Sequence, residues 1–229
     1  MATSFVLKFS KSGYVRYTSH LDMLRFFKRA FRKSGIALRY SQGFNPHPRM
    51  GFAQPLSLGY AGMNELLEFE TVSDHEAEQI LLALEGEMPE GIRIISAQAF
   101  VPADFHIRSL AAATESAAYT LLLPYPCSQE ELDKDLAAYL SQEQIMAQKR
   151  RKKDKKMVNE DIRPKIRHLS GRADGQTAAL AMTLDAGSTS NCSPELVISS
   201  FLASAGLDIP RYKIDVVREQ IDFVNNLHF

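Results

Sequence analysis

Two histidines and one aspartate near the N-terminus could transfer protons. His20 and Asp22 follow Ser19, and His47 lies in a later loop that begins near Ser41. Histidine titrates near neutral pH, so His20 and His47 could serve as acid and base on a bound substrate. Ser19 and Asp22 also have the spacing of residues that cap a helix. Because no spacing is specific to one reaction, His20, His47 and Asp22 remain candidates, and we favour a chain with no activity of its own.

The opening third of the chain could instead bind an anion. Residues 1–60 contain ten Lys and Arg residues and one acidic residue, although the formal net charge of the whole chain is zero. Residues 61–100 have the opposite bias, with nine acidic residues and one basic residue. A basic surface of this kind attracts phosphate-rich partners and speeds their encounter. The alternative is that acidic neighbours neutralise the block in the fold.

Five cations of this block fall on one face of a predicted helix at residues 20–34. Apolar side chains occupy the opposite arc, so burying that arc would project the cations into solvent together. The cationic set is Arg25, Lys28, Arg29, Arg32 and Lys33. Grouped cations repel one another and become favourable when bound phosphates release their counterions. A merely solubilising face is the other interpretation.

The loop at residues 40–49 combines flat and hydrogen-bonding side chains. Gly43 frees the backbone, whereas Pro46 and Pro48 restrict it. Flat rings can stack on bases, and amides and guanidinium groups can bind base edges or phosphates, as in single-stranded RNA recognition. The candidates here are Arg39, Tyr40, Gln42, Phe44, Asn45, His47 and Arg49. A packed corner between strands would use a similar composition.

A second basic segment covers residues 149–156, where Asp154 is the one acidic residue. Such runs are commonly solvated loops or helix ends. The strand predicted after it contains Pro164, which indicates an edge or a bulge. Arg163 could pair with Asp161 inside the sheet or extend the cationic surface, and the sequence leaves both open.

Several classes of protein are disfavoured by what the sequence lacks. Cys127 and Cys192 lie far apart with no metal-ligand spacing, so we expect no metal site and no cofactor. No apolar run reaches the roughly 20 residues that cross a bilayer, and the N-terminus resembles a strand rather than a signal peptide. We therefore expect a cytoplasmic protein without membrane contact.

The elements that must position these residues are predicted to occur twice in the order βαββαβ. In the first half, strands at residues 5–9, 36–41, 67–71 and 92–100 alternate with two helices, and residues 14–18 form an extra hairpin strand. The first helix ends at Gly35, and residues 73–76 form a capping box for the second.

The second half repeats this order, with strands at residues 119–123, 162–168, 178–184 and 211–217. Its helices cover residues 129–149 and the stretch from Ser193 to Gly206. The predicted fold class is therefore α+β, with two ferredoxin-like βαββαβ halves packed together. Residues 1–100 form the first half, 101–116 a linker and 117–229 the second half.

Three motifs resemble those of the bacterial radical-SAM-linked family, a domain of unknown function. These are Ser19-His20-Leu21-Asp22 with Arg25 and Arg29, the run at residues 40–49, and Asp161-Ile162-Arg163-Pro164. The resemblance covers essentially the whole chain. It implies a radical-SAM protein as partner, fused to the chain or encoded beside it, and implies no reaction.

This chain lacks the CxxxCxxC triplet that would hold a [4Fe–4S] cluster, so we expect the radical chemistry to lie in the partner. Our main hypothesis is an accessory protein that binds RNA or presents a substrate to a radical-SAM enzyme, in RNA or ribosome modification. One alternative is a small RNA-processing or RNA-modifying enzyme that uses His20 and His47. Another is a scaffold for the radical-SAM partner that binds no RNA.

Overall fold

The structure, a computed structural model, describes residues 3–151 and 154–229, so Lys152 and Lys153 of the second basic segment lie outside the described residues. The chain forms two compact units. Unit 1 contains the residues up to Glu115 together with Arg218–Phe229, and unit 2 is Ser116–Val217. No helix in the described ranges has the length and apolar character needed to span a membrane.

Unit 1 is built on an antiparallel sheet in the order β4-β1-β3-β2. Its strands are β1 (Thr3–Lys11), β2 (Met50–Phe52), β3 (Ala61–Thr71) and β4 (Ile92–Ala99). Its α-helices are α1 (His20–Lys33), α2 (Ala77–Glu85) and the short α3 (Leu110–Ala113), and short 3-10 turns lie at Gly13–Tyr17 and Pro102–Phe105. The order βαββαβ with strand order 4-1-3-2 is the ferredoxin-like arrangement.

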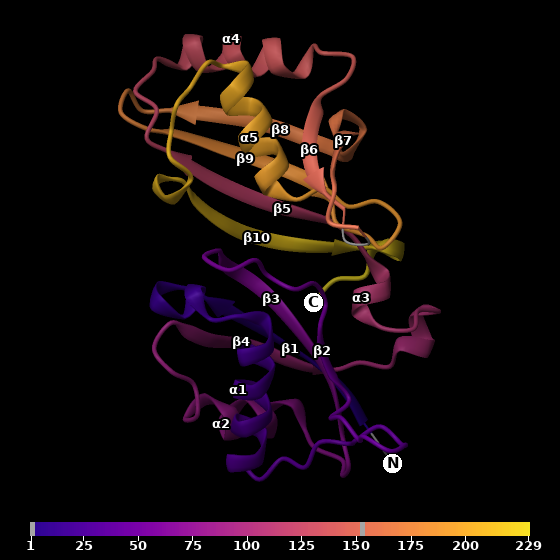
Figure 1. Cartoon of the computed structure of the whole chain (residues 1–229). Helices are drawn as coiled ribbons and strands as arrows, with labels where there is room; N and C mark the ends of the chain where they lie inside the picture. The colour runs from indigo at the N-terminus through magenta and orange to yellow at the C-terminus, as the bar shows by residue number, and fades with distance from the viewer. Residues whose placement is uncertain (1–2, 152–153) are drawn as a thin grey trace. The chain divides into compact units, whose positions relative to one another are not determined.

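Each face of this sheet has its own apolar core. Phe27 and Phe31 of α1 pack with Leu7 of β1 and Phe69 of β3, and α2 adds Ile80 to the same cluster. Figure 1 shows α1 and α2 on the same side of these strands. On the other face a cluster forms from β1, β3, α3 and the C-terminal segment, with members that include Val6, Leu66, Leu110, Ile221 and Phe223.

Unit 2 repeats the plan. It contains β5 (Thr114–Leu123), α4 (Gln129–Leu140), β8 (Ile166–Ala173), β9 (Ala178–Asp185) and α5 (Pro194–Ser204), with β10 (Asp215–Phe223) as fourth strand. The order β10-β5-β9-β8 is again 4-1-3-2. Between α4 and β8 the chain forms a separate two-stranded sheet from β6 (Met146–Arg150) and β7 (Met157–Asp161). The predicted fold class, α+β with two ferredoxin-like halves, is therefore confirmed.

Three local predictions in unit 1 were wrong. Residues 14–18 fall mostly in a 3-10 helix rather than a strand, because Gly13 turns the chain at φ +58° and Arg16 Nε bonds Gly59 O. Residues 36–41 make isolated bridges only, and β2 takes the place of the second strand. Helix α2 is capped by Glu76 with Gln79, three residues after the predicted Ser73 cap.

In unit 2 the predicted helix at residues 129–149 ends at Leu140, and its last four residues, 146–149, belong to β6. The predicted strand at residues 162–168 is interrupted by a 3-10 turn at Arg163–Lys165. Pro164 explains the interruption, because proline has no backbone N–H for a ladder.

The unit boundaries differ from the predicted ranges. The segment predicted as a linker carries α3, and its Leu110 and Ala113 are buried in unit 1. The C-terminal residues also belong to unit 1, because Ile221 and Phe223 join the same core. Burying the apolar side chains of both segments stabilises the folded state, and an exposed linker or tail would forgo this stabilisation.

Candidate nucleic-acid interface

The amphipathic pattern of α1 fixes which side chains face solvent. Ser19 caps the helix, with its Oγ accepting a hydrogen bond from the Asp22 backbone N–H at 3.2 Å. Met23, Phe27, Ala30 and Phe31 are buried. The opposite face is exposed and carries all five predicted cations, Arg25, Lys28, Arg29, Arg32 and Lys33.

After α1 the chain turns so that the following residues lie beside the helix. Gly35 has φ +78°, a left-handed conformation that favours glycine, and Ile36 N–H bonds Phe31 O at 3.1 Å. A groove of about 640 Å³ lies between the helix and this segment. Its lining comprises Arg25, Lys28, Arg29, Phe31, Arg32, Gly35, Ile36, Ala37, Leu38 and Tyr40. The groove thus has cationic side chains along an apolar floor.

The cations of the groove differ in their partners. Arg25 Nη1 lies 2.8 Å from Asp22 Oδ1, whereas Lys28, Arg29 and Arg32 form no ion pair within the part of the chain that the structure describes. Lys33, on the same helix face, pairs with Glu87 at 3.0 Å. Three adjacent positive charges therefore face the groove without a neutralising carboxylate.

Tyr40 brings an aromatic ring into the same groove. Lys28 Nζ lies 5.5 Å from the centre of the Tyr40 ring, a cation–π distance. Tyr40 is 43% exposed, so part of its surface is available to a ligand. Helix and loop, 12 positions apart in the sequence from Lys28 to Tyr40, thus contribute to one surface.

The loop after Tyr40 is closed by backbone bonds. Tyr40 and Pro48 form a β-bridge, Ser41 N–H bonds His47 O at 2.8 Å, and His47 N–H bonds Ser41 Oγ at 3.0 Å. Gln42, Phe44, Asn45 and His47 are all exposed. They line neither the groove nor the small cavity beside His20.

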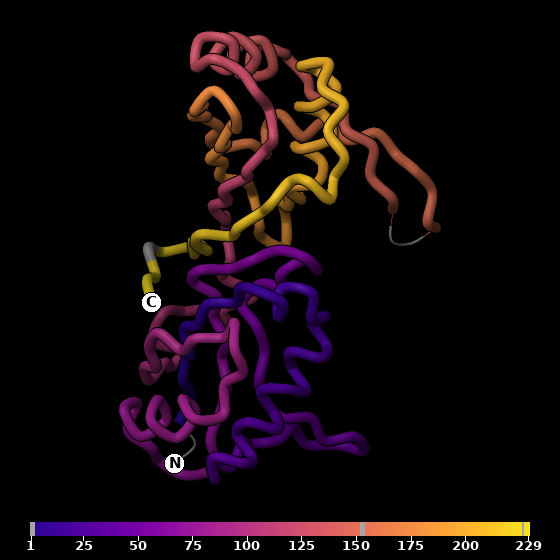
Figure 2. The backbone as a smooth tube through the Cα atoms, turned by 90° about the vertical axis from the view of Figure 1, so that its left-hand side faces the viewer, coloured from indigo at the N-terminus to yellow at the C-terminus, as the bar shows by residue number. Residues whose placement is uncertain are grey.

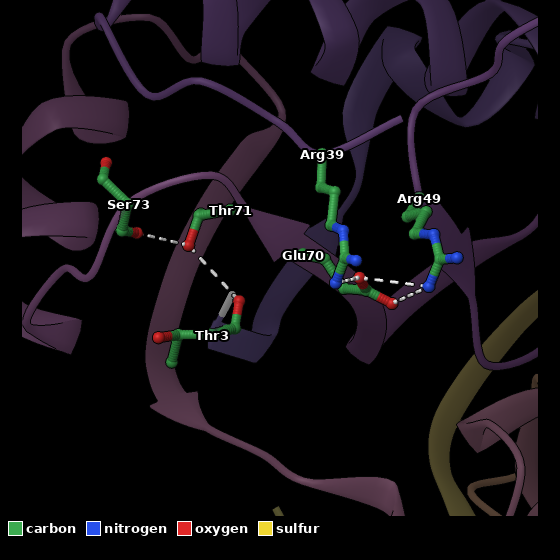
Figure 3. Close-up of polar contacts among 6 residues, drawn as sticks. All are labelled: Thr3, Arg39, Arg49, Glu70, Thr71 and Ser73. Carbon is green, nitrogen blue, oxygen red and sulfur yellow. Dashed lines mark hydrogen bonds and ion pairs between the residues drawn. The ribbon is translucent and has the colours of Figure 1, made fainter. Parts of the chain in front are cut away.

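Arg39 and Arg49, two of the predicted nucleic-acid-binding residues, share one carboxylate partner. Figure 3 shows both guanidinium groups pointing at Glu70, with nitrogen–oxygen distances of 3.3 Å for Arg39 and 3.0 Å for Arg49. In the same view Thr71 Oγ1 donates to Ser73 O at 2.8 Å, at the end of β3. These two predicted RNA-binding arginines are thus engaged by a carboxylate and hold the base of the loop against β3.

The two histidines lie in different surroundings. The His20 ring packs on Phe52 at 5.3 Å and lines a cavity of about 20 Å³ with Lys11 and Glu65. Burial and the nearby Lys11 charge lower the pKa of His20, which favours the neutral ring. His47 lines neither this cavity nor the groove. The third candidate, Asp22, has a lowered pKa because it accepts hydrogen bonds from Ser19 and Arg25.

The sequence reasoning missed a buried polar cluster beside His20. Arg218 Nε and Nη2 bond the two Glu65 carboxylate oxygens at 2.9 and 2.5 Å, and Arg218 Nη1 bonds Gln54 Oε1 at 2.7 Å. Arg218, Glu65 and Lys11 are each no more than 3% exposed. Strand alternation was the available signal, since Lys11 has the same parity as the buried Phe9.

Arg163, also predicted to bind nucleic acid, belongs to unit 2. Its Nε donates to Leu140 O at 3.1 Å, and its backbone N–H bonds Asp161 Oδ1 at 3.0 Å. These contacts hold the end of α4 beside the turn that contains Pro164. Asp161 thus contacts the backbone of Arg163, and no ion pair joins their side chains among the described residues.

No group of three or more His, Cys, Asp or Glu side chains gathers as a metal site in residues 3–151 and 154–229.

The fold and the groove define an α+β protein with a duplicated ferredoxin-like plan and a cationic surface on its first unit. The chain belongs to a family described as an uncharacterized protein conserved in bacteria (DUF2344), whose model matches residues 5–194. No curated protein matches the sequence.

The chain is similar to several solved structures, among them two crystal structures. A chain in the crystal structure of a Cbf5-Nop10-Gar1 complex has 10% sequence identity and a TM-score of 0.50, over 95% of this protein and 48% of that chain. This protein thus spans about half of that neighbour, and the likeness concerns the fold alone. The crystal structure of an unknown protein from Galdieria sulphuraria has 12% identity over 98% of this chain and 99% of that chain, with a TM-score of 0.27.

Proposed function

We propose that unit 1 binds single-stranded RNA in the groove beside α1. The observation that carries this proposal is the joint presence in one groove of about 640 Å³ of the Tyr40 ring and three cations, Lys28, Arg29 and Arg32, that have no carboxylate partner among the described residues. Cations bind the phosphates of a strand, and aromatic rings stack on its unpaired bases. Both kinds of contact are present here within one surface.

The apolar floor favours a single strand over a duplex. The exposed Ala37 and the edge of Leu38 line the bottom of the groove, and an unstacked base can cover such side chains. In a duplex the bases are stacked on one another and cannot enter. The exposed loop residues Phe44, Asn45 and His47 are available for further contacts with the same strand.

We further propose that the bound RNA is delivered to a radical-SAM protein. Support for this partner comes from the motif resemblance, in which Ser19, His20 and Asp22 lie at the start of α1 and Arg25 and Arg29 follow on the same helix. In the structure these motif residues serve two purposes, the capping of α1 and the lining of the groove. Ser19 caps the helix and donates its hydroxyl to Asp22, whereas Arg25 and Arg29 line the groove.

Catalysis by His20 and His47 together receives less support from the geometry. His20 lines a cavity of about 20 Å³, roughly the space of one water molecule, and His47 is exposed on the loop. A scaffold that binds an acidic partner protein and no RNA would also use grouped cations. Binding measurements with purified RNA distinguish this scaffold from the RNA-binding protein that we propose.

The test is photo-crosslinking of the purified chain to a labelled single-stranded RNA, followed by mass spectrometry of the crosslinked peptides. We expect crosslinks in residues 25–40, with Tyr40 as the main site, and their loss when excess unlabelled single strand is added. Crosslinks confined to other segments, or none that unlabelled strand removes, would overturn the proposal. Copurification of a cluster-bearing protein from cells tests the partner separately.

A further inference from the structure

The hairpin formed by β6 and β7 is a second charged surface, and the groove in unit 1 does not account for it. β6 pairs with β7 in antiparallel register, from Met146 opposite Asp161 to Arg150 opposite Met157. The two strands form a separate sheet and do not pair with β5, β8, β9 or β10. In Figure 2 this hairpin extends away from the rest of unit 2.

The inner face of the hairpin explains how it is held. Ala147 is buried, and Lys149 and Val158 are partly buried. Lys149 and Lys165 both pair with Glu160, at 3.0 and 2.6 Å. This ion-pair network connects the hairpin to the turn before β8, so the ribbon has a defined attachment.

The outer face presents hydrogen-bonding and apolar side chains to solvent. Gln148 lies directly opposite Asn159 in the ladder, and both are exposed. Met146 and Met157, on the same face, are 52% and 59% exposed. Side chains directly opposite in an antiparallel pair lie about 5 Å apart, so the two amides form one hydrogen-bonding unit.

Cations surround the end of the ribbon. Arg150, Lys155 and Lys156 are exposed and have no carboxylate partner within the described ranges, whereas Arg151 pairs with Asp154 at 3.4 Å. Arg151 N–H bonds Lys156 O at 2.8 Å and Lys155 N–H bonds Arg151 O at 2.9 Å, which shapes the described part of the turn. The chain thus holds three unneutralised cations next to an amide pair on one projecting ribbon.

We infer that this hairpin binds double-helical RNA, with the amide pair in the minor groove and the cations on the flanking phosphates. The minor groove of an RNA helix is wide and shallow and displays 2′-hydroxyl groups. Gln148 and Asn159 can donate to and accept from these hydroxyls. Arg150, Lys155 and Lys156 supply the phosphate contacts, which need no particular base sequence.

This inference extends the proposed function to a different surface and a different form of RNA. The groove of unit 1 binds unpaired bases, whereas the hairpin of unit 2 binds a paired stem. An RNA with a stem next to a single-stranded segment would offer both forms. Because the two surfaces use separate residues, the failure of one proposal is distinguishable from the failure of the other.

The test compares a blunt RNA duplex of about 16 base pairs, the length that small duplex-binding domains span, with an unstructured strand. The variant replaces Arg150, Lys155 and Lys156 with Gln. The control replaces Lys134, Arg172 and Lys213 with Gln, which removes the same charge from other exposed positions of unit 2. Circular dichroism checks that both variants remain folded.

For the hairpin variant we expect duplex affinity to fall by about tenfold or more and the salt slope of duplex binding to fall by about three, one for each lost phosphate contact. Binding of the single strand should change by less than about twofold. In Gln148→Ala/Asn159→Ala we expect a loss of the preference for RNA duplex over DNA duplex of the same sequence. The inference would be overturned if the protein did not bind the duplex, or if the hairpin and control variants bound it equally well. It would also be overturned if the hairpin variant bound the duplex normally but no longer copurified with a protein partner.

Discussion

Lys28 Nζ lies 5.5 Å from the centre of the Tyr40 ring, and this contact joins the cationic face of α1 to the start of the loop. A base that stacks on the other side of the ring would place its phosphate near the cations of the helix. The pair therefore links the two kinds of contact that single-stranded RNA requires.

Replacing Tyr40 with Ala should weaken single-stranded RNA binding by about 1–3 kcal/mol, because one base loses its stacking surface. Tyr40→Phe keeps the ring and should retain most of the affinity. Tyr14→Ala is the matched control, since Tyr14 is 94% exposed but does not line the groove. Fluorescence anisotropy with a labelled strand measures all three variants. Equal losses in Tyr40→Ala and Tyr14→Ala would show that the ring has no special role.

Arg39 and Arg49 share the Glu70 carboxylate, so we expect them to contribute little to RNA affinity. The double variant Arg39→Ala/Arg49→Ala should bind the single strand within about twofold of the wild type, and its unfolding free energy should fall by no more than about 2 kcal/mol, two exposed ion pairs at most. Glu70→Gln releases both guanidinium groups and should raise the affinity at low salt. A large loss of affinity in the double variant would show that these arginines do contribute to RNA binding.

Removing one partner of the Glu65–Arg218 ion pair should destabilise unit 1 strongly. Both side chains are buried, so Arg218→Ala leaves the Glu65 carboxylate without its guanidinium partner and with Lys11 as the nearby cation, at a cost of about 3–5 kcal/mol. The double variant Glu65→Leu/Arg218→Met removes the carboxylate and the guanidinium together and should recover much of that loss. Urea unfolding gives the three free energies. Equal stability of the double variant and Arg218→Ala would argue against the loss of the guanidinium partner as the cause.

His20 should make the stability of the protein fall at mildly acidic pH. In the folded protein its pKa lies below the ordinary histidine value of 6.5, because burial and the Lys11 charge disfavour the charged ring. As the pH drops below about 6.5 the unfolded chain takes up a proton that the folded chain resists, so unfolding becomes more favourable. His20→Gln should flatten the dependence of unfolding free energy on pH between about 7 and 5. An unchanged pH profile in His20→Gln would mean that another group titrates there.

The parts of the fold with strong periodicity could be predicted from the sequence. Helix α1 was predicted at residues 20–34 and is found at His20–Lys33, because its apolar and cationic arcs separate cleanly and Ser19 and Gly35 mark its ends. β6 was missed, since residues 141–149 contain no Gly or Pro to stop a helix and include good helix formers. Only its pairing with β7 makes this segment a strand.

The candidate site was predictable in its residue types but not in its partners. The cationic face of α1 follows from helical spacing, and Tyr40 was among the predicted residues. The pairing of Arg39 and Arg49 with Glu70, and of Arg218 with Glu65, joins positions far apart in sequence, 153 residues in the last case. Such pairs depend on strand register, which no local pattern contains.

The salt dependence of single-stranded RNA binding by Arg29→Ala/Arg32→Ala tests the central claim most directly. Both side chains line the groove without a carboxylate partner in the described part of the chain. Each lost phosphate contact lowers the slope of log K against log salt by about 0.7 for a single strand, so we predict a slope smaller by about 1.4. The control Arg93→Ala/Arg108→Ala removes the same charge from exposed positions of unit 1 outside the groove and should keep the wild-type slope. Equal slopes for the wild type and both variants would contradict the account.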